Sequence, residues 1–246
     1  MLNYQKDGYS IVVKLSVVIP NLNYGRYLRT CLDSLMNQSF QDYEVFLVDS
    51  GSSDETFTVL KDYPSVKVLM DIPASGPVNA VNKAIAVMKG KYFIQLNSDC
   101  WLAPLMYEQL VAILDSDPKL GMVYSSWFYV SESGEFLRKA KQPDKFKKYL
   151  LLKENFVDSS SAMIPKVVLD AVGNFDIEFP NTMDWIMAAK IGLLYPVSFI
   201  DEPLLYFRVH SGQISTGVKA VLAAEKARKK IAQMYGVKGK LTRLLP

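Results

Sequence analysis

The stretch "FIQLNSDCW", residues 93–101, combines a short apolar run with an abrupt polar ending. The apolar run, from Tyr92 to Leu96, predicts a buried strand, and Asn97, Ser98 and Asp99 follow it directly. A carboxylate at the end of a buried strand is costly unless a hydrogen-bond partner or a cation compensates for it. Asp99 therefore needs a partner from another part of the chain.

Strands that are apolar throughout alternate with helical segments over the first half of the chain. Continuous apolar runs predict strands at 15–20, 44–48, 66–70 and 92–96. Helical periodicity and capping signals predict helices at 26–38, 55–61 (capped by Asp54), 77–89 (ended by Gly90) and 104–114. This alternation is typical of a parallel sheet covered by helices on both faces.

Polar residues follow each of the predicted strands, at the ends where open parallel sheets bind their ligands. Asn21, Asp49, Asp71 and Asp99 occupy these positions. The three carboxylates come from neighbouring strand ends, so we expect them to form a cluster.

The second half has a different pattern. It predicts a strand at 122–130, a turn at 132–135, a helix at about 184–193 and a strand at 204–209. A final helix at 218–235 has its apolar positions at Val221, Leu222, Ile231 and Met234.

The composition is that of a globular protein with a sizeable core. Of 246 residues, 50% are hydrophobic and 12% aromatic, which excludes a disordered chain. Cys31 and Cys100 are too few for a disulfide scaffold or a four-cysteine zinc site. No apolar run reaches the length of about 18 residues that a membrane span needs, and the N-terminus lacks a signal-peptide pattern. We expect a cytoplasmic protein.

Charge is distributed unevenly along the chain. Residues 219–246 contain eight Lys or Arg and only Glu225, which gives this tail a charge of +7 and leaves −4 on the rest of a chain whose total is +3. The tail and the basic, aromatic stretch 138–153 could contact an anionic membrane surface. A solvated helix face is the alternative, and no stacking platform or recognition motif favours nucleic acid.

The usual phosphate-binding loops are absent. The sequence contains neither GxGxxG nor GxxxxGK[ST]. A divalent metal held by a carboxylate can bind substrate phosphates instead, and Asp99 is the natural ligand. The alternative is that Asp99 only caps the turn that follows its strand.

Seven stretches together resemble the family 2 inverting glycosyltransferases of the GT-A fold. They follow the family's order: 16–24 (SVVIPNLNY), 48–56 (VDSGSSDET), 76–83 (GPVNAVNK), 96–99 (LNSD), 172–176 (VGNFD), 183–185 (MDW) and 206–215 (YFRVHSGQIS). The resemblance implies an α/β fold with a Rossmann-like, mostly parallel central sheet flanked by helices and a smaller acceptor-side region. The implied GT-A domain spans 1–218, with a nucleotide-binding half at about 14–118 and an acceptor half at about 119–218. A basic helix and tail, 219–246, would follow.

The resemblance also implies roles for individual residues. Asp184 matches the catalytic base, and Asp99 and His210 match the metal site for Mn²⁺ or Mg²⁺. The residues that match nucleotide-binding positions are Pro20, Asn21, Asn23, Tyr24, Asp49, Ser50, Asp54, Asn82, Asn97 and Ser98.

The implied reaction is transfer of a sugar from a nucleotide sugar, most commonly a UDP-sugar, to a glycan or lipid-linked acceptor in surface polysaccharide synthesis. Asn97 stands at the first position of the DxD motif, Cys100 follows the motif, and Met183 precedes the base. Because the family commonly has acids at these positions, a catalytically degenerate nucleotide-binding or scaffold protein is the alternative. A nucleotidyltransferase ranks lower, because the loop NLNYGR, residues 21–26, has one glycine and one basic residue.

Overall fold

The computed structural model describes residues 13–213 and 217–237. The end of the seventh motif and the basic residues Lys238, Lys240 and Arg243 lie outside these ranges. Among the described residues, no helix combines the length and the apolar composition that crossing a membrane requires.

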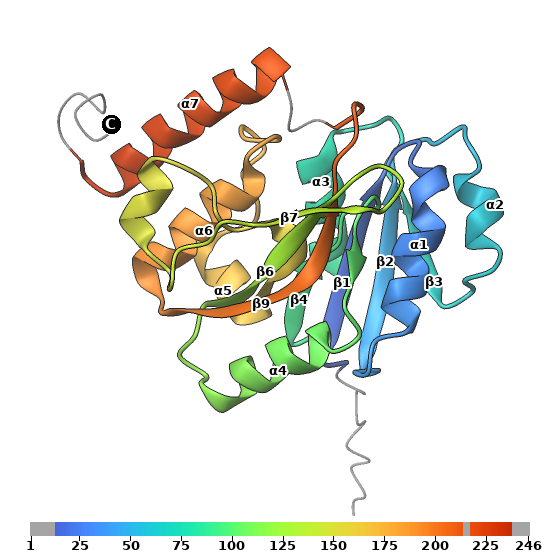
Figure 1. The fold of residues 1–246 in the computed structure, drawn as a ribbon, viewed down its shortest axis with the longest axis horizontal. Helices are drawn as coiled ribbons and strands as arrows, with labels where there is room; N and C mark the ends of the chain where they lie inside the picture. Colours follow the sequence, from blue (N-terminus) through green and yellow to red (C-terminus); the bar gives the residue numbers. More distant parts are fainter. Residues whose placement is uncertain (1–12, 214–216, 238–246) are drawn as a thin grey trace, which may run out of the picture.

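The first half of the chain forms the parallel part of the sheet (Figure 1). Strands β1 (Leu15–Asn21), β2 (Tyr43–Asp49), β3 (Val66–Met70) and β4 (Tyr92–Gln95) are parallel neighbours in the order β3-β2-β1-β4. The helices between them are α1 (Gly25–Met36), α2 (Thr56–Leu60) and α3 (Pro77–Val87). The predicted strands and helices of this half are confirmed to within two residues at their ends.

The second half extends this sheet with strands of both directions. The order continues from β4 through β8 (Ala162–Pro165), β6 (Met122–Val130) and β9 (Val197–Arg208) to β5 (Trp101–Leu102), and β7 (Phe136–Lys139) pairs with β6. Strand β8 is antiparallel to both β4 and β6, whereas β6 and β9 are parallel. The mostly parallel sheet is confirmed, with β8 reversed in its middle and the short strands β5 and β7 antiparallel to β9 and β6. The short strands β5, β7 and β8 were not predicted, because two to four residues are too few to show a period.

Both faces of the sheet are covered, as expected. Alternate residues of β1 point to opposite faces, so Val17 and Ile19 belong to one apolar core and Val18 to the other. The first core includes residues of α1 and of α4 (Met106–Ser116), and the second includes residues of α3 and of α6 (Met183–Leu194). The remaining short elements are the 3₁₀ helices η1 (Lys148–Leu152) and η2 (Ser159–Ser161) and the helix α5 (Lys166–Val172).

The last helix, α7 (Gly217–Met234), lies over α6 on the outside of the molecule (Figure 1). Its C-terminal half buries Ala227, Ile231 and Ala232. Of the apolar positions of the predicted helix, Ile231 is buried, whereas Val221 and Leu222 are 67% and 61% exposed. The reason is that only the C-terminal half of α7 has its apolar face against the core.

Gly90 does not end the third helix as predicted, because α3 stops at Val87 and Met88 is its C-cap. Instead, Gly90 lies against β1, where its backbone N–H donates to Ser16 Oγ at 2.9 Å. A Cβ atom at position 90 would be 2.4 Å from the backbone nitrogen of Ser16. Glycine is therefore required by a close approach between backbones.

We expect Gly90→Ala to lower the free energy of unfolding by about 1–3 kcal/mol, the usual cost of overpacking a core. Chemical denaturation measures this loss. Lys89→Ala is the matched control, because the Lys89 side chain is exposed and the substitution leaves the backbone bond from its N–H to Glu44 in place. A Gly90→Ala variant as stable as the control would show that the strand moves aside without cost.

Candidate functional site

Asn21 and Asp49 lie opposite each other at the carboxyl ends of β1 and β2. Asn21 Nδ2 donates to Asp49 Oδ2 at 3.0 Å. The Asp49 carboxylate also accepts from the N–H groups of Gly51 and Ser52, at 3.0 and 2.7 Å, and from the Ser52 hydroxyl at 2.7 Å. Since Asp49 is fully buried, these bonds compensate for the loss of hydration. The contact of this pair with a nucleotide stays a prediction.

The loop after β1 is bonded to the loop after β2. Asn23 adopts a φ of 56°, which Asn tolerates better than most residues, and its Oδ1 accepts from Ser53 N–H at 2.8 Å. Asp54 Oδ2 accepts from the N–H of Gly25, the first residue of α1, at 2.8 Å. Pro20 lies on β1 just before this loop. The predicted nucleotide-binding residues of the two loops therefore lie together at the carboxyl ends of β1 and β2.

Ser50 faces Asp71 at the end of β3, to which its hydroxyl donates at 3.3 Å. Asp71 is fully buried and accepts from Ser75 and from the Lys83 ammonium group. Burial alone would raise the pKa of Asp71, but the bonds from Lys83 and Ser75 outweigh it and bring the pKa down to about 2. Asp71 is therefore a charged partner of Lys83 at neutral pH.

Asp99 faces His210, 111 positions further along the chain. The His210 Nε2 and Asp99 Oδ2 atoms are 3.1 Å apart, and the two side chains are 1% and 11% exposed. The other ring nitrogen, Nδ1, accepts from Gly212 N–H at 3.2 Å. This network assigns the proton to Nε2, so that a neutral imidazole donates to the carboxylate. The Arg208 Nε–H donates to the backbone carbonyl of Asp99 at 3.0 Å.

Two tyrosines from α1 and the residue before it flank this pair. The ring centroids of Tyr24 and Tyr27 lie 5.5 and 4.9 Å from that of His210. The Tyr24 hydroxyl donates to the carbonyl of Gly212 at 3.2 Å. Desolvation and then the charge of Asp99 raise the pKa of Tyr24, so it remains a neutral hydrogen-bonding group. Tyr24 thereby links the predicted nucleotide loop to the predicted metal site.

Asn97 and Ser98 form the turn between β4 and Asp99. Asn97 Oδ1 accepts from the Gln95 side chain at 2.9 Å, and the Asn97 N–H donates to Ser160 Oγ at 3.0 Å. Ser98 is 5% exposed. The structure therefore fixes the backbone of the NSD motif from η2, an element distant in sequence.

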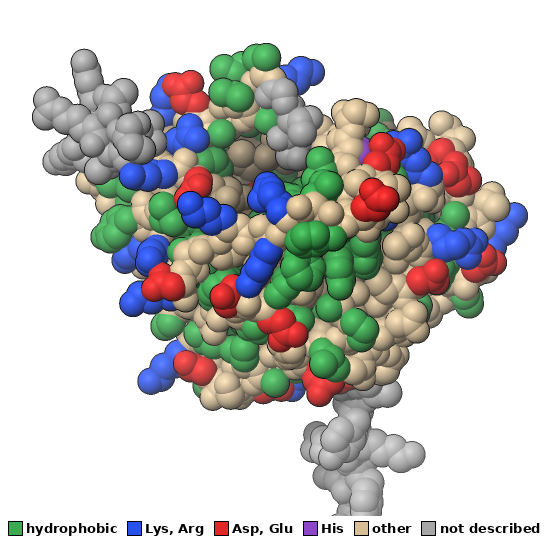
Figure 2. Space-filling view, in the orientation of Figure 1, with side chains coloured by type: hydrophobic (Ala, Val, Ile, Leu, Met, Phe, Trp, Pro, Cys, Tyr) green, Lys and Arg blue, Asp and Glu red, His purple; other side chains and the backbone are tan. Residues whose placement is uncertain are grey.

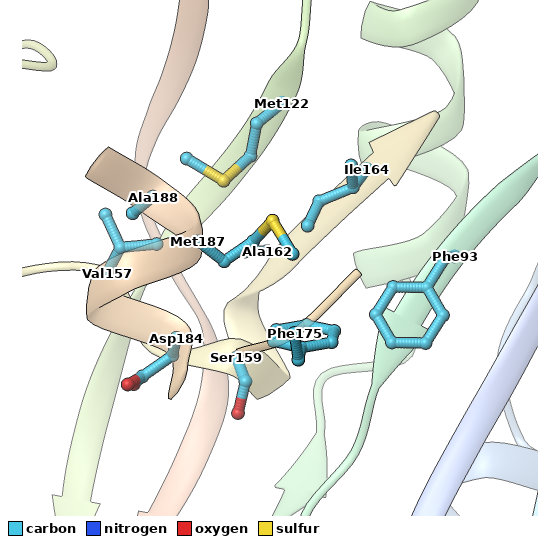
Figure 3. Close-up of a pocket in the computed structure, with 10 residues that line it drawn as sticks. All are labelled: Phe93, Met122, Val157, Ser159, Ala162, Ile164, Phe175, Asp184, Met187 and Ala188. Carbon is cyan, nitrogen blue, oxygen red and sulfur yellow. The ribbon is translucent and has the colours of Figure 1, made fainter. Parts of the chain in front are cut away.

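Asp184 lies at the start of α6, as predicted, at the rim of a small apolar pocket. Figure 3 shows its carboxylate and the Ser159 hydroxyl at one end of this pocket, pointing away from the apolar side chains. Its oxygens accept from Asn155 Nδ2 at 3.0 Å and from Trp185 N–H at 2.7 Å. Desolvation exceeds these favourable bonds and raises the pKa of Asp184 to about 6.

Asn82, on α3, uses both ends of its side-chain amide within the chain. Its Nδ2 donates to the Phe175 carbonyl at 2.9 Å, and its Oδ1 accepts from the Phe175 N–H at 3.2 Å. Asn82 therefore joins α3 to the loop of the fifth motif, and its contact with a nucleotide stays a prediction.

The structure places the strand-end residues at the carboxyl ends of the parallel strands but, among the described residues, does not bring the three carboxylates there into one cluster. Asp49, Asp71 and Asp99 each have their own partners.

The structure also adds Asp158, which the sequence analysis did not predict. Desolvation first and the charge of Asp184 second raise the pKa of Asp158 to about 7. The signal in the sequence was the polar run 158–161 between two apolar segments.

Asp99 and His210 suit a divalent cation that is also held by phosphate. Among the residues described, no group of three or more His, Cys, Asp or Glu side chains could hold a metal. The pair supplies one carboxylate oxygen and one imidazole nitrogen, and Nε2 would have to release the proton that it donates to Asp99 in order to bind the metal. Mg²⁺ and similar ions commonly use one or two protein ligands and take the rest from substrate phosphates and water.

Comparison with known proteins points to one family. The family model described as "Glycosyl transferase family 2" matches residues 16–172. An uncharacterized glycosyltransferase of Rickettsia prowazekii is 28% identical over 216 residues, which cover 85% of this chain and 67% of that protein. The chain thus spans about two thirds of this relative's length.

Two solved structures share the fold. TarS 1-349 of S. aureus in complex with UDP-GlcNAc matches with a TM-score of 0.74 and 19% identity, over 89% of this chain and 66% of that chain. Mannosyltransferase PcManGT from Pyrobaculum calidifontis, in complex with GDP-Man and Mn²⁺, matches with a TM-score of 0.64 and 18% identity, over 94% and 78%. These likenesses confirm the GT-A fold that the sequence predicted.

Proposed function

The chain belongs to glycosyl transferase family 2, and we propose that it is a metal-dependent, inverting glycosyltransferase. Its donor is a nucleotide sugar, with a UDP-sugar as first choice, and its acceptor is a glycan or a lipid-linked precursor. The observation that carries the proposal is the raised pKa of Asp184, which is about 6. This carboxylate is partly buried and lies at the rim of a pocket. A base with a pKa near the working pH is the most effective proton acceptor.

The donor side of the site is formed by the loops that follow the carboxyl ends of β1, β2 and β4. Asp99 and His210 would hold a divalent metal there, in agreement with the Mn²⁺ complex of PcManGT. Such a metal neutralises charge on the departing diphosphate. The complex of TarS with UDP-GlcNAc supports a UDP-sugar as donor.

The acceptor side is the region around Asp184. The acceptor hydroxyl attacks the anomeric carbon and gives its proton to the Asp184 carboxylate. The bond between the anomeric carbon and the diphosphate oxygen breaks, and the diphosphate keeps the electron pair. Because base and leaving group lie on opposite faces of the sugar, the configuration inverts. Asn155 and the Trp185 N–H hold the carboxylate in place.

The N-terminal half of α7 is a candidate contact with an anionic membrane, where lipid-linked acceptors would be found. Val218, Val221 and Leu222 are exposed at positions i, i+3 and i+4, and Lys219 is exposed beside them. Figure 2 shows hydrophobic side chains at this end of α7 with basic ones nearby. Exposed apolar residues on a basic helix are typical of binding in the plane of a membrane surface.

Asp184→Asn should abolish transfer while leaving nucleotide affinity unchanged, because the amide cannot accept a proton at neutral pH. A loss of at least about 100-fold in kcat is expected from removing a general base. Donor turnover and nucleotide titration measure the two effects, and Asp117→Asn, an exposed carboxylate at the C-cap of α4, is the control. Retained transfer would remove Asp184 from this role. Nucleotide binding without turnover in the wild type would favour the catalytically degenerate alternative.

The wild-type rate should rise with pH and reach half its plateau near pH 6. The sign follows from the raised pKa of Asp184: the carboxyl is protonated and inactive at low pH and ionised above about 6. A pH profile of kcat on a saturating donor tests this. A rate that is constant from about pH 5 to 7 would contradict a base with this pKa.

Asp99→Ala should remove the metal-dependent part of nucleotide affinity. We expect Mn²⁺ with UDP to raise the melting temperature of the wild type, EDTA to cancel the shift, and the variant to show no difference between the two conditions. GDP, dTDP and CDP, tested alongside, identify the base. An unchanged metal dependence in Asp99→Ala would show that Asp99 is not a ligand.

Replacing Val221 and Leu222 together by Glu should weaken binding to phosphatidylglycerol vesicles by about tenfold or more, because it removes apolar contact and adds like charge. Vesicle sedimentation measures the binding. Val167→Glu is the control, since Val167 is 74% exposed on a different helix, α5. Equal binding by both variants, or none by the wild type, would exclude α7 as a membrane contact.

A further inference from the structure

Asp158 begins the turn that forms η2, and only part of its carboxylate is used within the chain. Its Oδ1 accepts from the Ser160 N–H at 2.8 Å, and its backbone carbonyl accepts from the Ser161 N–H and hydroxyl, at 3.0 and 2.9 Å. The Ser160 side chain also bonds to this carboxylate. Because a carboxylate has about four acceptor sites and Asp158 is partly exposed, part of its hydrogen-bonding capacity is left for a ligand.

The turn that Asp158 begins connects the two sides of the proposed site. Ser160 Oγ accepts from the N–H of Asn97, in the motif that leads to Asp99. Ser159 lines the same pocket as Asp184, and Figure 3 shows the two polar groups at the same end of it. Asp158 therefore belongs to a segment that touches the diphosphate side and the base side at once.

Electrostatics agrees with this position. The charges of both Asp184 and Asp99 act on Asp158 and, after desolvation, raise its pKa to about 7. The contact of Ser160 with Asn97 and the shared pocket of Ser159 and Asp184 place this turn between the two carboxylates.

The proposed reaction requires the transferred sugar to lie between Asp99 and Asp184. Its diphosphate is then near Asp99, and its anomeric carbon faces the acceptor at Asp184. We propose that Asp158 accepts a hydrogen bond from a hydroxyl of the transferred sugar and so helps to select the donor. The inference rests on the proposed function and adds a residue that recognises the sugar rather than the nucleotide. Hydrogen bonds from hydroxyls to carboxylates are among the stronger neutral-to-charged contacts, and sites built around such bonds reject analogues that lack the hydroxyl.

The test compares nucleotide with nucleotide sugar. Isothermal titration with Mn²⁺ first identifies which of UDP-GlcNAc, UDP-Glc, UDP-Gal and GDP-Man binds the wild type. Asp158→Asn keeps an oxygen for the Ser160 N–H but removes the charge. We expect it to leave the Kd of the free nucleoside diphosphate within about twofold and to raise the Kd of the nucleotide sugar about tenfold or more.

Asp117→Asn is the matched control, because Asp117 Oδ1 also accepts from the N–H two residues on, at 3.0 Å, and is exposed at the end of α4. A series of monodeoxy analogues of the bound donor identifies the hydroxyl: one of them should bind the wild type and Asp158→Asn with equal affinity. A role that is only structural would not produce this match.

Three outcomes would overturn the inference. Unchanged affinity of Asp158→Asn for the nucleotide sugar would show that no contact exists. Equal losses for nucleotide and nucleotide sugar would assign Asp158 to holding the Asn97 turn. Failure of the wild type to bind any nucleotide sugar would refute the proposed function itself, and is distinguished from the other two because it appears without mutation.

Discussion

The buried contact between Asp99 and His210 is the interaction on which the site depends. It joins the end of β4 to the end of β9, segments 111 positions apart, and it resolves the cost of placing a carboxylate after a buried strand. The pairing of β5 with β9 supports it, because Trp101 and Tyr206 are register partners and their rings stack 5.2 Å apart. Arg208 adds a bond to the backbone of Asp99. Neighbouring strands and Arg208 thus hold the contact between these two distant segments on several sides.

The carboxylates of the domain differ because the fold compensates for their burial to different degrees. Asp49 and Asp71 are fully buried, and each receives several hydrogen bonds, so both serve the architecture of the loops. Asp184 and Asp158 receive fewer bonds than their desolvation demands, and their pKa values rise to about 6 and about 7. A carboxylate of the second kind is poised to gain or lose a proton near neutral pH. The number of hydrogen bonds that a buried carboxylate receives thus decides whether desolvation raises its pKa.

The sequence predicted the first half of the fold well, because each strand from β1 to β4 is a mostly apolar run between turn residues. The sequence did not predict the very short strands, nor the features that depend on packing between distant elements. Strands β5, β7 and β8 are too short to carry a period, and Gly90 has a role that only the neighbouring backbone of β1 explains. In α7, the pattern showed that Val221 and Leu222 are apolar. It could not show that the core covers only the C-terminal half of this helix. Asp158 was missed because an Asp before three serines is typical of any turn.

The sequence by itself determined the family, the alternation of strands and helices, and the edge of the sheet at which polar residues gather. These are local properties, since a strand's period and its terminal residues can be read within ten positions. Only the tertiary structure decided which residues meet: Asp99 with His210, Asn82 with the backbone of Phe175, and the η2 turn with Asn97. The physical reason is that these pairs are separated by 63 to 111 residues, and their contact is set by strand order and desolvation rather than by local preference. Proton affinity follows the same rule, because it depends on what surrounds a carboxyl group and not on its neighbours in the chain.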